Sequence, residues 1–237
     1  MNTRTKFTRS LGQLLYWSGI ILGMALLAGS VWADIEAMFY GFEKMGDKAV
    51  SSLRCPLLIT PAGTAEITAR FTNPTDREVQ QLLRSDISGP LVQTERTSVT
   101  LAPGESQRVA WTVAWDDVAF GLFVLVKISA YPAHPFSFRE SSCGMVAVNV
   151  PFLSGGQLTA LLTVLTLLLL IVGLLLSPDR DLLLGKRVVN ASYARIVLAG
   201  ILVAGLLCGL LNLAVLAALL LVLAVLTALS MLYLLAT

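Results

Sequence analysis

Hydrophobic positions fall into four long, nearly unbroken runs along the chain. The runs cover residues 11–33, 157–177, 196–211 and 213–236. A helix needs about 20 apolar residues to cross the hydrocarbon core of a bilayer, so the runs predict four transmembrane helices. The last two runs are separated only around Asn212, where the polar side chain predicts a tight turn.

Residues 55–152 follow a different pattern, in which apolar and polar positions alternate. Ile67, Ala69 and Phe71 alternate with polar neighbours, and so do Val109 and Trp111, which is typical of strands with one buried face. Further strand-like runs lie near residues 57–60, 78–84, 91–101, 121–131 and 143–150. Seven short strands separated by turn sequences predict an all-β sandwich inserted between the first and second helices.

Residues 34–54, between the first helix and the sandwich, predict a separate amphipathic helix. Asp34 is placed to cap its N-terminus, and Met38, Phe39 and Phe42 lie on one apolar stripe at helical spacing. We expect this stripe to contact the membrane surface or a partner. The alternative is that it packs beneath the protein's own domain.

Composition and charge indicate how the chain is placed. With 56% hydrophobic and only 14% charged residues, it is too apolar for a soluble protein of this length. Basic residues gather in residues 1–10 and 178–195, and such segments stay on the cytoplasmic side. We therefore expect a multi-pass protein of the plasma (inner) membrane, with both termini cytoplasmic and residues 34–153 extracytoplasmic. No basic patch interleaved with aromatic residues indicates binding to nucleic acid.

The first hydrophobic run has two interpretations. It is either a signal peptide cleaved after Ala33 or an anchor that is retained. Its length exceeds the roughly 7–15 apolar residues of a signal peptide, and Tyr16, Trp17 and Trp32 lie near its two ends, as in the aromatic belts of spanning helices. We expect an uncleaved anchor.

The predicted sandwich resembles a known class of domain. The pairing of ARFTNPTDREV with SVTLAPGESQRVAWTV resembles bacterial immunoglobulin-like or fibronectin-like extracytoplasmic domains, over about residues 56–150. The resemblance implies a fold and no function. Because the first and last strands of such sandwiches often lie close together, we expect a disulfide between Cys55 and Cys143 in an oxidising compartment. Two free buried thiols are the alternative.

Residues able to carry chemistry are sparse. His134 is the only histidine, so histidine-rich zinc, copper and haem sites are not expected. The adjacent Asp116 and Asp117 would point to opposite faces of a strand, and they more simply mark a turn. Cys208 lies inside the third run and reads as a packing residue. We predict no catalytic, cofactor-binding or metal-binding residue and no small-molecule substrate, so the chain is not expected to be an enzyme.

The hydrophobic runs do contain small residues at the four-residue spacing through which helices pack closely in lipid. These helix-packing candidates are Gly19, Gly23, Gly205, Gly209, Ala214 and Ala218. The runs have no charged residue in their interiors, although proton and ion pathways need such groups. Transport by this chain alone is therefore not expected.

Two functional hypotheses follow. The first is a non-catalytic accessory or scaffolding subunit of a multi-subunit membrane complex, whose helices contact other membrane-protein subunits and lipids and whose sandwich docks on the outer face of the complex. The second is a membrane-anchored binding or sensing module, whose sandwich captures a peptide, a glycan or another envelope ligand through a sheet edge or through the loop around His134.

Overall fold

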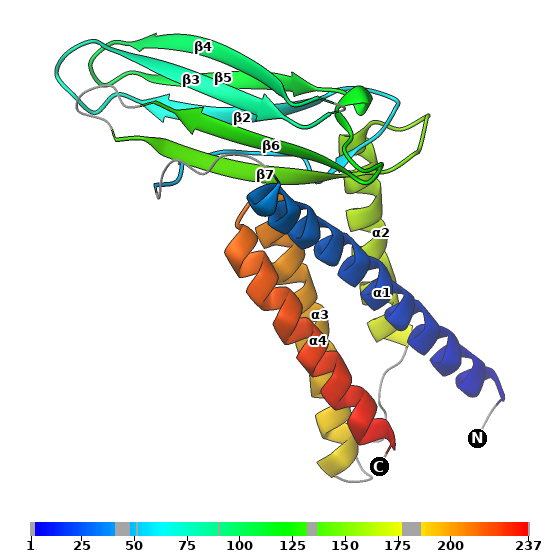
Figure 1. The fold of residues 1–237 in the computed structure, drawn as a ribbon. Coiled ribbons are helices and arrows are strands. Elements are labelled where there is room, and N and C mark those ends of the chain that lie inside the picture. The colour runs from blue at the N-terminus through cyan, green and yellow to red at the C-terminus, as the bar shows by residue number, and fades with distance from the viewer. Residues whose placement is uncertain are drawn as a thin grey trace. The chain divides into compact units, whose positions relative to one another are not determined.

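The computed structural model describes residues 3–40, 48–50, 52–89, 91–131, 137–176 and 186–236. The chain divides into two compact units, one of Trp32–Thr159 and one of Met1–Val31 with Ala160–Thr237. Within the described residues it forms four long helices and seven strands (Figure 1). The helices are α1 (Thr3–Phe39), α2 (Gly155–Leu176), α3 (Lys186–Leu210) and α4 (Ala214–Ala236).

The expectation of four long apolar helices is confirmed. One segment of each helix is long and apolar enough to cross a membrane: Thr8–Phe39, Gly155–Leu176, Tyr193–Leu210 and Ala214–Met231. The turn between α3 and α4 falls at residues 211–213, as predicted. There Asn212 adopts a left-handed φ of 57°, and the N–H of Leu213 donates to the carbonyl of Cys208 at 2.8 Å. Asparagine tolerates this conformation better than most residues.

Two predicted helix boundaries differ from the structure. α1 continues without a break past residue 33 to Phe39, so Asp34 lies inside a helix and caps none. Its sequence there contains neither Gly nor Pro to stop the helix. Residues 48–50 and 52–54 are not helical, and Arg54 instead forms a bridge with Thr68, so the predicted helix over 34–54 does not extend that far. Phe42 lies outside the described residues.

The second difference is at the start of α3, which begins at Lys186, ten residues before the predicted start at 196. Residues 186–195 were expected in the cytoplasmic loop 178–195. They contain no Gly or Pro and are compatible with helix despite their polarity. Hydropathy therefore located the apolar part of α3 and missed its polar first turns.

The unit of Trp32–Thr159 contains two sheets. The strands are β1 (Leu58–Ile59), β2 (Ala65–Thr72), β3 (Val79–Ile87), β4 (Gln93–Leu101), β5 (Ser106–Val113), β6 (Phe123–Ala130) and β7 (Arg139–Ala147). One sheet has the order β1-β7-β6-β3-β4 and the other pairs β2 with β5. All pairs are antiparallel except β1 with β7. The predicted strands are all present, and β7 begins at Arg139 rather than near residue 143.

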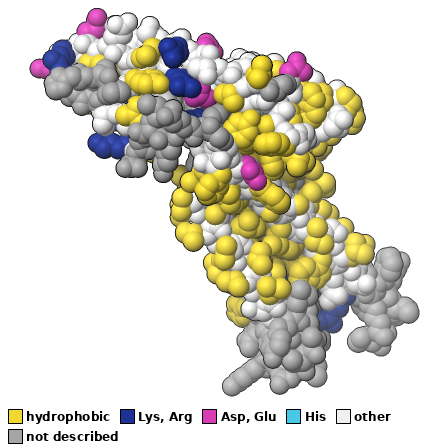
Figure 2. Space-filling view, viewed as in Figure 1, with side chains coloured by type: hydrophobic (Ala, Val, Ile, Leu, Met, Phe, Trp, Pro, Cys, Tyr) yellow, Lys and Arg dark blue, Asp and Glu magenta, His cyan; other side chains and the backbone are white. Residues whose placement is uncertain are grey.

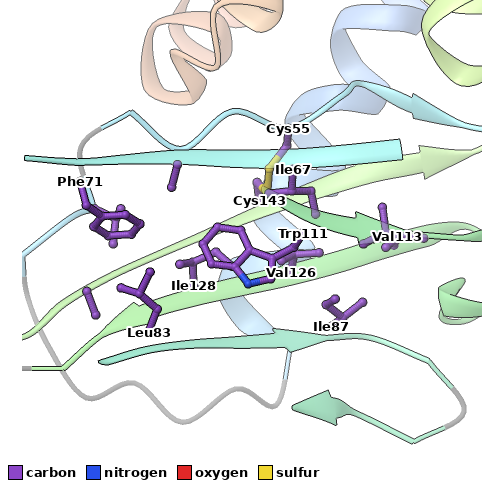
Figure 3. Close-up of a cluster of buried hydrophobic side chains, with 14 of the residues drawn as sticks. Cys55, Ile67, Phe71, Leu83, Ile87, Trp111, Val113, Val126, Ile128 and Cys143 are labelled. Atoms are coloured by element: carbon purple, nitrogen blue, oxygen red, sulfur yellow. A yellow bond between two sulfur atoms is a disulfide. The ribbon is translucent and has the colours of Figure 1, made fainter. Parts of the chain in front are cut away.

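The two sheets pack face to face around one hydrophobic core. Ile67, Phe71 and Trp111 contribute from the two-stranded sheet, and Leu83 and Val126 are among those from the five-stranded sheet. Figure 3 shows the Trp111 ring among these aliphatic side chains. Alternation along each strand places every second residue in this core. The domain is a sandwich-like arrangement of two sheets, which we call the sandwich.

The other unit has its own core, formed by the helices. Along α4 the buried or partly buried residues recur at alternating spacings of four and three, which form one stripe on a helix. These residues are Ala217, Leu221, Ala224, Ala228 and Met231. α3 contributes Leu198, Leu202 and Leu206 to the same core, and α1 contributes Tyr16, Ile20 and Leu27. The hydroxyl of Tyr16 donates to the carbonyl of Arg195 at 2.9 Å.

Candidate functional surfaces

The last turns of α1 pack on the outer face of the five-stranded sheet. Ala33 and Ala37, one helical turn apart, are buried against Phe123 and Leu125 of β6. Gly144 of β7 makes the contact closer still, because a Cβ atom added there would overlap the backbone of Ala33. Small side chains on the helix and a glycine on the strand thus allow the two backbones to meet.

Asp34 attaches this helix to the edge of β7. The N–H of Gly144 donates to the Asp34 carboxylate at 3.1 Å. The N–H groups of Val146 and Val148 point the same way and donate at 2.9 Å to the carbonyls of Leu57 and Ile59. β1 is only two residues long, so Gly144 lies before the stretch of β7 that β1 covers. Asp34 supplies the missing acceptor, in a charge-assisted bond.

α2 begins at the same edge of the sheet. The N–H of Gln157 donates to the Ser154 hydroxyl at 3.3 Å, and the N–H of Ser154 donates to the Gln157 side chain at 3.0 Å, which is a capping box. A Cβ atom added at Gly155 would overlap the backbone of Leu58 in β1. The Thr60 hydroxyl also donates to the Leu153 carbonyl at 2.6 Å. The chain therefore enters and leaves the sandwich at one edge, formed by β7 and β1.

The predicted disulfide between Cys55 and Cys143 is confirmed, with a Cα–Cα distance of 6.5 Å. It joins the segment before β1 to β7, at the position next to Gly144, and Figure 3 shows it at the border of the core. The disulfide, Asp34 and the capped start of α2 form three attachments at this edge, which we call the attachment edge. Burial of α1 on the sheet adds a fourth contact.

The two ends of the sandwich differ in chemistry. The loops 60–64, 88–92, 114–122 and 148–154 lie at the end where β1 and β7 finish, which we call the helix-side end because α2 starts there. Large apolar side chains project from it, with Leu91 83%, Phe120 77% and Phe152 77% exposed. Leu122 and Val92 are also exposed. Asp117 at this end is buried and its carboxylate accepts the N–H of Ala114 at 2.8 Å.

The opposite end carries the loops 73–78 and 102–105, with exposed Asp76, Arg77, Glu78 and Glu105, and the connection from β6 to β7, of which residues 132–136 lie outside the described part of the chain. No large hydrophobic residue in these two loops is exposed. The buried Asn73 organises them, since its amide donates to the carbonyls of Arg77, Leu101 and Ala102 at 2.7–3.1 Å. Figure 2 shows most of the visible charged side chains of the domain toward its left end and a denser hydrophobic surface toward its right end.

Phe120 occupies an unusual backbone conformation at the helix-side end. Phe120 and Gly121 both have positive φ, 54° and 69°, and the N–H of Leu122 donates to the carbonyl of Ala119 at 3.1 Å. These are the features of a type I′ turn, which favours Asn-Gly. A bulky aromatic residue in the left-handed region costs about 1–3 kcal/mol. The Phe120 ring packs against Tyr40, just beyond α1, with ring centres 5.9 Å apart.

The outer face of the five-stranded sheet also holds buried charges. Lys127 of β6 pairs with Glu140 of β7 at 2.9 Å, and both side chains are nearly inaccessible. On β3, Arg84 contacts Asp86 at 2.8 Å, and the Asp86 carboxylate also accepts the Thr94 hydroxyl at 2.7 Å. Hydrogen bonding to Tyr131, and then to Asp86, raises the pKa of the Arg84 guanidinium above its usual value. Each positive charge is paired with a negative one, which is the arrangement of structural ion pairs.

The predicted helix-packing glycines lie against helices of this same chain. Gly19 contacts Leu169 and Leu170 of α2, while Gly23 contacts Thr166 of α2 and Leu202 of α3. Gly205 packs against Leu27 of α1, and a Cβ atom added at Gly209 would lie 3.6 Å from the Ser30 hydroxyl oxygen.

The alanines of α4 that were predicted to pack against other helices are not the most buried ones. Ala218 is partly buried against the helical core, whereas Ala214 is not part of it. Ala217 and Ala224 are the fully buried alanines. The stripe at alternating four- and three-residue spacing contains Ala217, which lies between the predicted Ala214 and Ala218.

The predicted contact residues Met38 and Phe39 are exposed on the last turn of α1, at 70% and 80%, beside the buried Ala37. At these two positions the stripe is not packed beneath the protein's own domain.

The residues considered for chemistry do not form a site where the structure describes them. Asp117 is buried in structural hydrogen bonds, while its neighbour Asp116 is exposed. His134 lies outside the described residues, and Cys208 is a half-buried free thiol in α3. No group of three or more His, Cys, Asp or Glu side chains able to hold a metal ion occurs in the described ranges.

Three structural residues were not singled out from the sequence: Gly144, Gly155 and Phe120. The first two act through strands that are distant in sequence. Only for Phe120 did a local signal exist, in the Phe-Gly pair between two strands.

No protein-family model and no curated protein matches this chain. Among solved structures, the chain is similar to the CARDB domain of a Pyrococcus furiosus protein in complex with di-metal ions, with 12% identity and a TM-score of 0.34 over 41% of this chain and 90% of that one. It is also similar to Bacteroides uniformis β-glucuronidase 2, with 13% identity, a TM-score of 0.32 and coverage of 40% of this chain and 12% of that one. A third similar structure is a Listeria innocua β-glucosidase in complex with glucose, with 13% identity, a TM-score of 0.31 and coverage of 42% and 16%. The chain therefore spans less than a fifth of either enzyme.

Proposed function

We propose that this chain is a non-catalytic accessory subunit of a multi-subunit membrane complex. Its four apolar helices span the plasma membrane with both termini in the cytoplasm, and its sandwich lies on the outer face. The observation that carries the proposal is the attachment edge. A domain whose first and last segments are braced by a disulfide, a packed helix end and a capped helix start is suited to present its own surface to neighbours.

The sandwich itself is proposed to be immunoglobulin-like. When the strands are lettered in chain order, the neighbours β3, β6 and β7 correspond to the C-F-G sheet of an immunoglobulin constant domain. The pair β2 and β5 corresponds to the B and E strands of its other sheet. β1 and β4 differ, because both join the C-F-G side here.

The helical unit supports the role of a subunit through its outward surface. The glycines at close-packing spacing contact helices of the same chain, so they maintain the unit itself. Leu219, Val222 and Leu226 of α4 are exposed together with Leu168 of α2. In a bilayer such surfaces are covered by lipid or by the apolar helices of other subunits, and no charged group has to be matched.

Photo-crosslinking in native membranes tests this proposal, with a photoreactive amino acid placed at one position of α4 at a time. At Leu219, which is exposed, it should capture a specific neighbouring polypeptide. At Ala224, which is fully buried in the same helix, it should capture none. Capture of nothing but lipid at Leu219, and at equivalent exposed positions of α2, would contradict the subunit proposal.

The second proposal, a binding or sensing module, is favoured by one feature. β4 is an edge strand of nine residues with mostly exposed side chains, and exposed edges can accept a strand from another polypeptide. A proline at Arg96 or Ser98 should abolish such capture. The same substitutions should not change assembly of a complex held together by the helices.

A further inference from the structure

We infer that the helix-side end of the sandwich is a membrane-surface contact, in which apolar side chains insert into the interface of the outer leaflet. The inference rests on the proposed placement of the helices across the membrane. It adds a contact with the lipid that is made by loops of the sandwich together with the last turn of α1. We call the inserted residues the apolar rim: Leu91, Val92, Phe120, Leu122, Phe152, Met38 and Phe39.

The first argument is the difference between the two ends of one domain. Loops of a soluble sandwich are polar, since they run over the surface in water, and the loops around Asn73 fit that description. The helix-side loops instead expose Leu91, Phe120 and Phe152, each at 77% or more. Scattered apolar residues on a surface are ordinary, but several from separate loops at one end mark an interaction site.

The second argument identifies what covers the rim. Phe152 lies three residues before α2, and Met38 and Phe39 are in the last turn of α1, so the rim is continuous in sequence with two helices that are apolar enough to span a membrane. From Leu11 to Val31, α1 is about 30 Å long at 1.5 Å per residue, which matches the hydrocarbon thickness. The residues that follow in α1 are therefore in the interfacial layer, where aromatic side chains are enriched.

The third argument is the composition of the rim. The segments 118–122 and 150–153 contain no ionisable residue. Three of the carboxylates that lie nearby are engaged: Asp34 accepts the Gly144 N–H at 3.1 Å, Glu36 accepts the Trp32 indole N–H at 2.9 Å, and Asp117 accepts the Ala114 N–H at 2.8 Å. Asp116, in the loop before Phe120, is exposed. A rim of apolar side chains with a carboxylate at its border suits the boundary between headgroups and acyl chains.

The fourth argument is the backbone at the tip. Phe120 is kept at positive φ in a turn whose geometry asparagine would satisfy with less strain. The Phe120 ring touches Tyr40, yet 77% of the residue stays exposed, and a strained residue with so exposed a side chain points to a role outside the fold. The turn aims an aromatic ring and the adjacent Leu122 outward at the end of the domain where α2 begins.

The test is lipid quenching of a fluorophore on the full-length chain in lipid nanodiscs. Single cysteines replace Leu91 or Phe152 in a Cys208→Ala background with the native disulfide kept oxidised, and each is labelled with the environment-sensitive dye NBD. Asp76→Cys, at the opposite end, is the matched control, and Ile21→Cys, an exposed position of α1, reports on the span. The nanodiscs contain phosphatidylcholine with or without bromine atoms on the acyl chains near the headgroup or near the bilayer centre.

At Leu91 and Phe152 we expect blue-shifted emission and loss of most of the fluorescence with lipids brominated near the headgroup. The Asp76 label should keep the emission of a dye in water and show no quenching. Water-like emission at both rim positions would overturn the inference. Blue-shifted emission without quenching by lipid would overturn it as well, because it would show that protein covers the rim, either a second copy or a partner.

The Ile21 label separates this inference from the proposed function. Quenching of Ile21 by deeply brominated lipid, together with unquenched rim positions, would leave the spanning helices intact and refute only the membrane contact of the sandwich. An Ile21 label that no lipid quenches would refute the placement of α1, on which both depend. As a second measurement, Phe120→Ser with Leu122→Ser should weaken quenching at Leu91 without changing the melting of the domain by more than Asp76→Ser does.

Discussion

Two adjacent glycines at the start of α2 provide a sharp test of the attachment edge. Gly155 and Gly156 both lie in the first turn of the helix, and each can be replaced by alanine. A Cβ atom at Gly155 would overlap the backbone of Leu58, coming within 2.8 Å of its carbonyl carbon and 3.1 Å of the Cα of Ile59. A Cβ atom at Gly156 would meet nothing within 4 Å.

The structure allows the magnitude to be worked out. Inserting a methyl group into a tightly packed contact costs about 1–3 kcal/mol. Because the obstacle is backbone, α2 and β1 must separate, which weakens the 2.6 Å hydrogen bond from the Thr60 hydroxyl to the Leu153 carbonyl at a cost of about 1 kcal/mol. Gly155→Ala should therefore destabilise the domain by about 2–4 kcal/mol. Gly156→Ala should be neutral or stabilising by up to about 1 kcal/mol, since alanine favours helix.

The assay is thermal unfolding of the full-length chain in mild detergent. Unfolding is monitored through the near-ultraviolet circular dichroism signal to which the buried Trp111 contributes. For a domain of this size, 1 kcal/mol corresponds to a change in Tm of about 4 °C, so the two variants should differ by about 8–20 °C. Equal melting temperatures for the two variants would refute the close approach of α2 to β1, and with it the attachment edge.

Four further predictions address other parts of the domain. Asn73→Ala removes the amide that donates to three carbonyls at the end of the sandwich opposite the helix-side end, and it should lower the free energy of unfolding by about 3 kcal/mol. Asn149→Ala, at an exposed position, should change that free energy by less than about 0.5 kcal/mol. Urea titration measures both. Phe120→Asn should raise that free energy by about 0.5–1 kcal/mol, because asparagine fits the type I′ turn, and a loss of stability would show that the aromatic contact with Tyr40 outweighs the strain. Reduction of the disulfide between Cys55 and Cys143, which are 88 residues apart, should lower stability by about 4–5 kcal/mol, measured as the shift in the urea midpoint with and without a thiol reductant. Asp34→Ala should speed hydrogen exchange at the Gly144 amide by at least about tenfold, for a lost bond of 1.5–3 kcal/mol, and leave exchange at Val126 in the middle of β6 unchanged.

The alternation of polar and apolar residues was sufficient to predict the sandwich. Ile67, Val109 and Trp111 face the core because side chains alternate on a strand, and this depends only on local sequence. The same holds for the turn at Asn212, where one polar residue interrupts an apolar run. The disulfide was predictable once Cys55 was placed at the start of such a domain and Cys143 in its last strand.

Contacts between distant segments were not predictable in this way. Asp34 reads as an N-cap because it follows an apolar run, yet in the fold its carboxylate bonds to Gly144, 110 residues later. Gly155 reads as a residue at a helix start, whereas in the fold it is constrained by close contact with the backbone of β1. The early start of α3 at Lys186 was missed because hydropathy detects the apolar part of a helix and is insensitive to polar helical turns.

The central claim, that this chain acts through contact with other subunits, is tested most directly by its mass after extraction from native membranes. Native mass spectrometry in a mild detergent should detect the 25.4 kDa chain within a larger particle that contains other polypeptides in fixed ratio. Recovery of the folded chain as a free 25.4 kDa monomer, under conditions that preserve other membrane complexes from the same preparation, would contradict the claim.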